Sequence, residues 1–300
     1  MDNEAMDSFD EIRGKSDLAE AFRKISVELY NKEHNPAKAL EAINQACALD
    51  PENSRYIYDR DRILENVGAD PLVRLSMLEE KKELIDERDD LSLNYISVLS
   101  RNGREEEALD RLMGRNFHLD EELQPKIIAV YKELLFAFAL REIKEGNKDR
   151  AAVLCELTFT YPDCLGVNKG KALPDNKGWY LIGEIKKDEG KDEEAEEAYK
   201  KAAEGPLEPE LLKSVSDYPS DSLYWIGLAK ARLGQQKEAL DIMRKLMDFG
   251  SANMKEETFG EDKEEELLYE TYRDELVTKN NEYCRMLISL GVKGLGEVNR

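Results

Sequence analysis

The sequence is poor in the residues that usually build metal sites and nucleophilic centres. Its only histidines and cysteines are His34, His118, Cys47, Cys155, Cys164 and Cys284. These residues are scattered, and no CxxC, HExxH or GxSxG motif occurs. The stretch 166–171 has three residues between its glycines, where a phosphate-binding loop has four. We therefore expect no metal, no cofactor and no catalytic residue, and predict that the chain is not an enzyme.

Long apolar runs are also lacking. The first 17 residues are acidic and polar, without the basic and apolar regions of a signal peptide. No apolar run of 18 residues is present, so we expect no membrane-spanning helix. Widely spaced cysteines without a CxxC pair are typical of reduced thiols, and they predict a cytoplasmic location.

Positive charge is in short supply. Lysine and arginine number 44 against 65 aspartates and glutamates, which gives a formal net charge of −21. Such a chain repels phosphate backbones and anionic membranes, so we expect neither nucleic acid nor membrane as a partner. The charge would attract a basic partner, although solubility alone also explains it. Against this background Lys169, Lys171 and Lys177 form a basic cluster, suited to an acidic partner or to ion pairs with a neighbouring helix.

A regular spacing of glycine and alanine is the strongest positive signal. Four glycines are each followed five residues later by an alanine, and successive glycines are 43, 44 and 44 residues apart: Gly103/Ala108, Gly146/Ala151, Gly190/Ala195 and Gly234/Ala239. Each pair lies between two stretches with apolar residues at helical spacing. A constant period of this size indicates an array of stacked helical hairpins.

The predicted fold is therefore all-α, a right-handed α-solenoid of about six helix pairs plus a terminal helix. We expect a flexible lead-in over 1–17, or a frayed first helix there, and a single superhelical domain over 18–300. The predicted repeats are 20–53, 54–87, 89–116, 124–162, 176–206 and 220–250, with a half repeat at 280–300. Gly291 and the run Gly294-Leu295-Gly296 predict that the last helix, Tyr283–Leu290, ends in a turn. An unfinished last repeat with apolar residues also suggests a piece of a longer protein.

The residues at the helix crossings resemble a known family. Tyr30, Ala39, Ile43, Ala46 and Pro51 are similar to a tetratricopeptide repeat, and the fifth repeat is the best match, with Trp179, Ile182, Gly183, Gly190, Ala195, Tyr199 and Ala202. This resemblance implies that the first helix of each pair lines a concave groove. Some members of the family hold a peptide C-terminus with a lysine and asparagine clamp, and only Asn94 resembles part of one.

A narrower resemblance covers most of residues 18–300. It rests on the stretches 66–91, 115–118 and 161–171, which are similar to the C-terminal repeat region of large bacterial proteins that begin with a β-rich domain. This resemblance implies a link to carbohydrate metabolism. We expect no β-rich domain within these 300 residues, so an activity that resides in such a domain would be absent from them.

Aligning the repeats on their glycine and alanine pairs selects candidate binding residues. One position of the first helix holds an aromatic residue in four of five repeats, and charged or polar residues follow it. The predicted set in the concave groove is Tyr58, Arg62, Asn94, Arg101, Phe136, Tyr180, Glu184, Tyr224 and Arg232. Such rings suit an extended peptide or a sugar, but they equally suit packing against the preceding repeat.

Three functional hypotheses follow. The first is a non-enzymatic scaffold that binds a peptide or protein segment in its concave groove. The alternative is an accessory repeat region of a carbohydrate-active or sugar-binding bacterial protein whose β-rich domain lies elsewhere. The third is self-association through the C-terminal helix, where Met286, Leu287 and Leu290 give an apolar surface.

Overall fold

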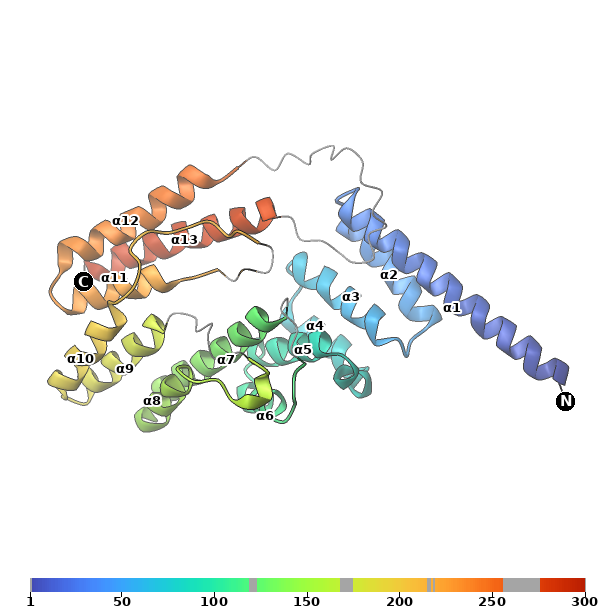
Figure 1. The fold of residues 1–300 in the computed structure, drawn as a ribbon, viewed down its shortest axis with the longest axis horizontal. Coiled ribbons are helices and arrows are strands. Elements are labelled where there is room, and N and C mark those ends of the chain that lie inside the picture. The colour runs from blue at the N-terminus through green and yellow to red at the C-terminus, as the bar shows by residue number, and fades with distance from the viewer. Residues whose placement is uncertain are drawn as a thin grey trace. The chain divides into compact units, whose positions relative to one another are not determined.

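The computed structural model describes residues 2–118, 123–167, 175–214, 217, 219–255 and 276–299, with side chains from residue 13 onward. All regular structure in these residues is helical. The helices are α1 (Asp2–Asn31), α2 (Pro36–Leu49), α3 (Ser54–Asn66), α4 (Pro71–Glu79), η1 (Lys82–Glu87), α5 (Asp89–Arg101), α6 (Glu105–Met113), α7 (Gln124–Glu145), α8 (Lys148–Leu157), η2 (Asp163–Leu165), α9 (Asn176–Asp188), α10 (Asp192–Ala202), α11 (Ser222–Arg232), α12 (Gln236–Asn253) and α13 (Leu276–Val298) (Figure 1).

The described residues divide into two compact units, 2–104 and 105–299. In the first unit α1 packs on α2, and α3, α4 and α5 contact one another. In the second unit the consecutive pairs α7 and α8, α9 and α10, and α11 and α12 form hairpins. The predicted third repeat, 89–116, is divided, because α5 belongs to the first unit and α6 to the second. A single domain over 18–300 stays a prediction.

The repeated glycine and alanine positions have the roles that their spacing predicts. Gly103, Gly146, Gly190 and Gly234 all have positive φ values, between 74° and 86°. This is the left-handed region, which costs an L-residue with a side chain about 1–2 kcal/mol. The four alanines that follow are at most 1% exposed, and Ala151, Ala195 and Ala239 belong to hairpins whose two helices contact each other closely.

The two ends of the array compare differently with expectation. Helix α1 begins at Asp2 and includes residues 2–17, where a first helix was the alternative to a flexible lead-in. This segment contains no proline, and its residues other than Gly14 are compatible with helix. At the other end, the predicted turn at Gly291 and Gly294–Gly296 is wrong, since α13 continues through these glycines to Val298.

The glycines of α13 serve close packing instead of a turn. Helices α12 and α13 lie side by side in Figure 1 and share the most extensive helix–helix contact among the described residues. A Cβ atom on Gly291 would stand 2.6 Å from the carbonyl oxygen of Met243 on α12. Gly294 faces the side chain of the same methionine, and Gly250 of α12 faces the backbone of Cys284. The absence of side chains therefore lets the two backbones approach each other.

Candidate functional site

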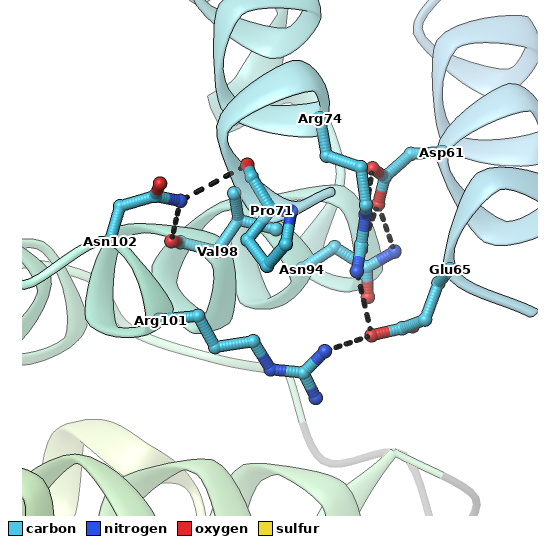
Figure 2. Close-up of polar contacts among 8 residues, drawn as sticks. All are labelled: Asp61, Glu65, Pro71, Arg74, Asn94, Val98, Arg101 and Asn102. Carbon is cyan, nitrogen blue, oxygen red and sulfur yellow. Dashed lines mark hydrogen bonds and ion pairs between the residues drawn. The ribbon is translucent and has the colours of Figure 1, made fainter. Parts of the chain in front are cut away.

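In the first unit, two of the predicted binding residues belong to a polar network among α3, α4 and α5 (Figure 2). The Arg74 guanidinium donates two hydrogen bonds to the Asp61 carboxylate, at 2.9 and 2.8 Å. Asn94 donates its amide to the same carboxylate at 2.9 Å. Glu65 accepts hydrogen bonds from Arg74 at 3.0 Å and from Arg101 at 3.3 Å. The network joins three helices of this unit.

Burial separates the members of this network. Asn94 is only 2% exposed, and Asp61 and Arg74 are buried beside it. Asn94 is therefore a packing residue in the structure, and its predicted role in binding has no exposed surface to support it. Arg101 lies at the edge, with about half of its side chain exposed. The sequence pattern placed Asn94 and Arg101 on the same helix, but it did not show that one is buried and the other half exposed.

The other two predicted residues of this unit are half-buried on α3. The guanidinium of Arg88 lies 5.5 Å from the centre of the Tyr58 ring. Burial raises the pKa of Tyr58 to about 12. Arg62 is half-buried one helical turn further along α3. Thus the ring of Tyr58 already has a cationic neighbour from its own unit.

In the second unit, four of the predicted residues line one groove. Its volume is about 730 Å³, and it is formed by α9, α11, the first residue of α12 and the end of α13. Tyr180 and Glu184 come from α9, and Tyr224 and Arg232 come from α11. The fifth predicted residue of this unit, Phe136, is on α7 and is buried. Aligning the repeats on their glycine and alanine pairs therefore selected residues that line the same groove. Tyr180 and Tyr224 are 44 positions apart in the sequence, and Glu184 and Arg232 are 48 positions apart.

The base of this groove is aromatic. The ring of Trp225 lies 5.5 Å from that of Tyr180 and 4.9 Å from that of Tyr224, between ring centres. Tyr199 of α10 packs against Tyr180 at 6.0 Å. Tyr224 is only 1% exposed and Tyr180 9% exposed, so these two rings contact neighbouring side chains over most of their surface. Burial raises the pKa of Tyr180 to about 12.

The rim of the groove is charged. Arg232 donates two hydrogen bonds of 2.7 Å to the Glu184 carboxylate, which also accepts the hydroxyl of Tyr199 at 2.7 Å. The pKa of Arg232 is raised, first by its hydrogen bond to Glu184. On α13, Glu297 accepts a hydrogen bond of 2.6 Å from the hydroxyl of Tyr224. Glu184 and Glu297, the two carboxylates of the rim, therefore each accept a hydrogen bond from a buried tyrosine.

Two cationic side chains of the rim extend toward solvent. The side chain of Arg232 is 51% exposed and that of Lys293 is 59% exposed. The Lys293 ammonium lies 5.2 Å from the centre of the Tyr224 ring and 3.8 Å from the Glu297 carboxylate. The arrangement can hold a ligand by ionic and hydrogen bonds at the rim, with part of Trp225 as the apolar contact.

Sequence reasoning missed Trp225 and the residues of α13. Trp225 comes one residue after Tyr224, which the repeat alignment selected. The alignment alone does not show that Trp225 also lines the groove. Lys293 and Glu297 were missed because the glycines around them predicted a turn. Their spacing of four residues with opposite charge is a helical signal that supports a continuous helix.

Other kinds of site find little support in the part of the chain that the structure describes. No cluster of three or more histidine, cysteine, aspartate or glutamate side chains there could hold a metal ion. All four cysteines are unpaired, and burial raises the pKa of Cys155 to about 12, which keeps its thiol protonated. None of the described helices combines the length and the apolar character that crossing a bilayer requires.

Helical hairpins in series, with a buried alanine in each of α8, α10 and α12, define an all-α solenoid of tetratricopeptide type. A family model described as "Tetratricopeptide repeat" matches residues 177–204, which lie in the fifth predicted repeat and carry α9 and α10. The groove residues Tyr180 and Glu184 fall inside this match. The resemblance to the family seen in the sequence is thus supported at the repeat where it is strongest.

Three solved structures are similar to this chain in fold, at low sequence identity. A MamA protein is 16% identical over 64% of this chain and 89% of its own, with a TM-score of 0.40. PilW, described as a type IV pilus biogenesis factor, is 15% identical over 77% and 92%, with a TM-score of 0.43. The pilF protein of Pseudomonas aeruginosa is 15% identical over 79% and 93%, with a TM-score of 0.45.

Proposed function

We propose that this chain is a non-enzymatic interaction protein that binds a peptide or protein segment in the groove between α9, α11 and α13. The observation that carries the proposal is the groove itself, which combines an aromatic base with charged groups from three helices, of which Arg232 and Lys293 are exposed. Protein-binding sites commonly place aromatic and arginine side chains at their centre and charged groups at their rim.

The exposed groups indicate how a segment would be held. The Arg232 guanidinium has five N–H donors, of which two serve Glu184, so further donors can reach backbone carbonyls of a bound chain. The Lys293 ammonium adds another exposed donor, and Trp225 offers an apolar contact. The net charge of −21 favours a basic segment as the partner, because long-range attraction speeds encounter.

Peptide selection on the intact chain tests the proposal. A library of random peptides is displayed, binders to the full chain are isolated, and their affinities are measured by calorimetry. The double variant Arg232→Gln/Lys293→Gln should weaken the selected peptides by about 1–3 kcal/mol, which is roughly 5- to 150-fold, because it removes the exposed donors of the rim.

A matched control removes the same charge elsewhere. Lys200 and Arg244 have exposed side chains outside the groove, so Lys200→Gln/Arg244→Gln should leave the affinity unchanged. If both double variants bind every selected peptide as tightly as the parent chain does, the groove is not the binding site. Tyr224 is unsuitable for this test, because truncating a ring that is 1% exposed destabilises the fold itself.

The other hypotheses from the sequence gain less support. A sugar would stack on open ring faces, yet Tyr180, Tyr224 and Phe136 are buried, so none of the predicted aromatic residues offers such a face to the carbohydrate-linked alternative. A glycan array probed with the intact chain tests it directly. Self-association through the C-terminal helix loses part of its basis, since Leu287 packs inside the second unit. A cytoplasmic location and a β-rich companion domain stay predictions.

A further inference from the structure

Helix α1 carries an apolar stripe that its own unit leaves partly uncovered. Leu18 is 49% exposed and Ile25 is 46% exposed. Phe22 and Leu29 are half-buried, and each packs against the core of the first unit. These four residues follow one another at intervals of four, three and four positions, so they lie along one side of the helix. We call them the α1 stripe.

The α1 stripe lies apart from the side chains by which α1 contacts its neighbours. The Ser26 hydroxyl donates a hydrogen bond of 2.6 Å to the Ala39 carbonyl of α2, which lies along one side of α1 (Figure 1). Arg23 donates to the Asp59 carboxylate of α3 at 2.7 Å. Positions 23 and 26 are on a different side of the helix from the stripe. Neither α2 nor α3 therefore covers the exposed residues of the stripe.

The last helix, α13, presents a different kind of surface. Its exposed side chains are largely polar, and they include Glu282, Arg285, Ser289 and Lys293. Val277 and Val292 are also exposed on this helix, but they are about four turns apart and form no stripe. An apolar stripe on α1 thus has no matching stripe on α13, which disfavours association of the first helix of one copy with the last helix of another.

Charge also distinguishes α1 from the rest of the chain. The whole chain has a net charge of −21, so two copies repel each other over most of their surface. Residues 13–32 instead contain five basic and three acidic residues: Arg13, Lys15, Arg23, Lys24 and Lys32, against Asp17, Glu20 and Glu28. Two copies that approach each other through this part of α1 avoid the repulsion between acidic surfaces.

The basic cluster predicted from the sequence offers no comparable surface. Lys169 and Lys171 lie outside the described residues. Lys177 is half-buried in the first turn of α9, where its Nζ lies 4.6 Å from the centre of the Phe136 ring and 5.5 Å from that of the Trp225 ring. The two ring faces stabilise its ammonium within the second unit.

We propose that two copies of this chain associate through their α1 stripes, as an antiparallel helix pair around a two-fold axis. The intervals of the stripe are the same from either end, so the stripe is complementary to itself in this orientation. Leu18 of one copy faces Leu29 of the other, and Phe22 faces Ile25. This contact does not involve the groove between α9, α11 and α13.

Two exposed lysines mark the ends of the proposed contact. Lys15 and Lys32 precede and follow the stripe by three residues each, so Lys15 of one copy lies opposite Lys32 of the other. Their repulsion is small, because long side chains in water can move apart and salt screens them. Lys32 also donates a hydrogen bond of 3.2 Å to Glu28 of its own helix.

The proposed contact is short, which limits its strength. From Lys15 to Lys32 an α-helix rises about 25 Å. A single helix pair of this length buries less than the roughly 800 Å² per partner of a standard interface. We therefore expect a reversible dimer with a dissociation constant in the micromolar range.

Sedimentation equilibrium of the intact chain tests this proposal. Between about 1 and about 300 µM the mean mass should rise from that of one chain toward that of two. The double variant Leu18→Glu/Ile25→Glu should raise the dissociation constant by at least about tenfold, because its charges would be buried against apolar side chains of the other copy. Its circular dichroism spectrum should not change, since both positions are about half exposed.

A matched control adds the same charge to the other end of the array. Val277→Glu/Val292→Glu changes two exposed residues of α13, at 38% and 55% exposure, and should leave the association unchanged. A parent chain that stays monomeric over the whole concentration range would overturn the proposal. So would a dimer that the α1 variant does not weaken more than the α13 variant does.

Cross-linking tests the orientation of the pair. Unlabelled and nitrogen-15-labelled chains are mixed, treated with a short amine-reactive cross-linker and analysed by mass spectrometry. We expect links between Lys15 of one copy and Lys32 of the other, which about 25 Å of helix separates within a single copy. Links between the two Lys15 residues, without any link from Lys15 to Lys32, would show a parallel pair and contradict the antiparallel arrangement.

Discussion

At the residue scale, the buried pair of Asp61 and Arg74 is a demanding contact. Both side chains are withdrawn from water, so each would carry a large desolvation cost if the other were missing. The two hydrogen bonds between them and the amide of Asn94 satisfy most of the donors and acceptors involved. The pair therefore fixes how α4 sits against α3 and α5, even if its net contribution to stability is modest.

Removing one partner should be costly. We expect Arg74→Met to lower the free energy of unfolding by about 3–5 kcal/mol, because Asp61 is left buried without its ion-pair partner. Urea unfolding followed by circular dichroism measures the loss, and hydrogen exchange at α3 to α5 locates it. Arg101→Met is the matched control. Its side chain is half exposed and its bond to Glu65 is long, so the loss should stay below about 1 kcal/mol. Equal losses in the two variants would contradict the assignment.

The sequence indicated which residues share a helix position but not how deep each one lies. Tyr180, Glu184, Tyr224 and Arg232 were selected from one register and do line one groove. Tyr224 is nevertheless buried, because Trp225 and the α13 residues Lys293 and Glu297 cover it. Coverage by a helix far along the chain is a tertiary property, and helical periodicity holds no information on it.

At the element scale, glycine has two distinct uses that the sequence pattern did not separate. Gly190 and its equivalents have positive φ and end a helix, as their spacing predicts. Gly291 is helical, and it is required because the Met243 carbonyl oxygen of α12 lies only 2.6 Å from where its Cβ would be. A glycine near the end of a helical pattern suggests a turn from local preferences alone, and only the packing of α13 on α12 distinguishes the two cases.

Two substitutions in α13 test this distinction. Gly291→Ala should destabilise the chain by about 1–3 kcal/mol, because the added methyl group forces α12 and α13 apart. Gly296→Ala should instead stabilise it by about 0.5–1 kcal/mol. Nothing lies within 4 Å of the added methyl group at that position, and alanine favours helix. Urea unfolding monitored by tryptophan fluorescence measures both. The same sign of change in the two variants would refute the close packing of α13.

At the scale of the whole molecule, the two compact units predict unfolding in more than one step. Both tryptophans are in the second unit, with Trp179 stacked on Phe159 at 4.3 Å and Trp225 in the groove. Fluorescence therefore reports the second unit, whereas circular dichroism reports all helices. In repeat arrays each element contacts only its neighbours, so cooperativity along the chain is limited.

We therefore expect the urea transition seen by fluorescence and the one seen by circular dichroism to have different midpoints or slopes. Arg74→Met in the first unit should shift the circular dichroism curve and leave the fluorescence curve in place. Superimposable curves in the parent chain, moved together by this variant, would show instead that the chain unfolds as one cooperative body.

The contrast between the two kinds of helix junction has a mechanical consequence. At α12 and α13 the backbones meet through Gly250, Gly291 and Gly294, and such contacts lose their attraction after a very small displacement. At α3, α4 and α5 the long side chains of Arg74 and Arg101 can follow a helix as it moves and keep their bonds. Under a pulling force the junction of α12 and α13 should be stiff and then separate abruptly. The junction of α3, α4 and α5 should extend before it separates.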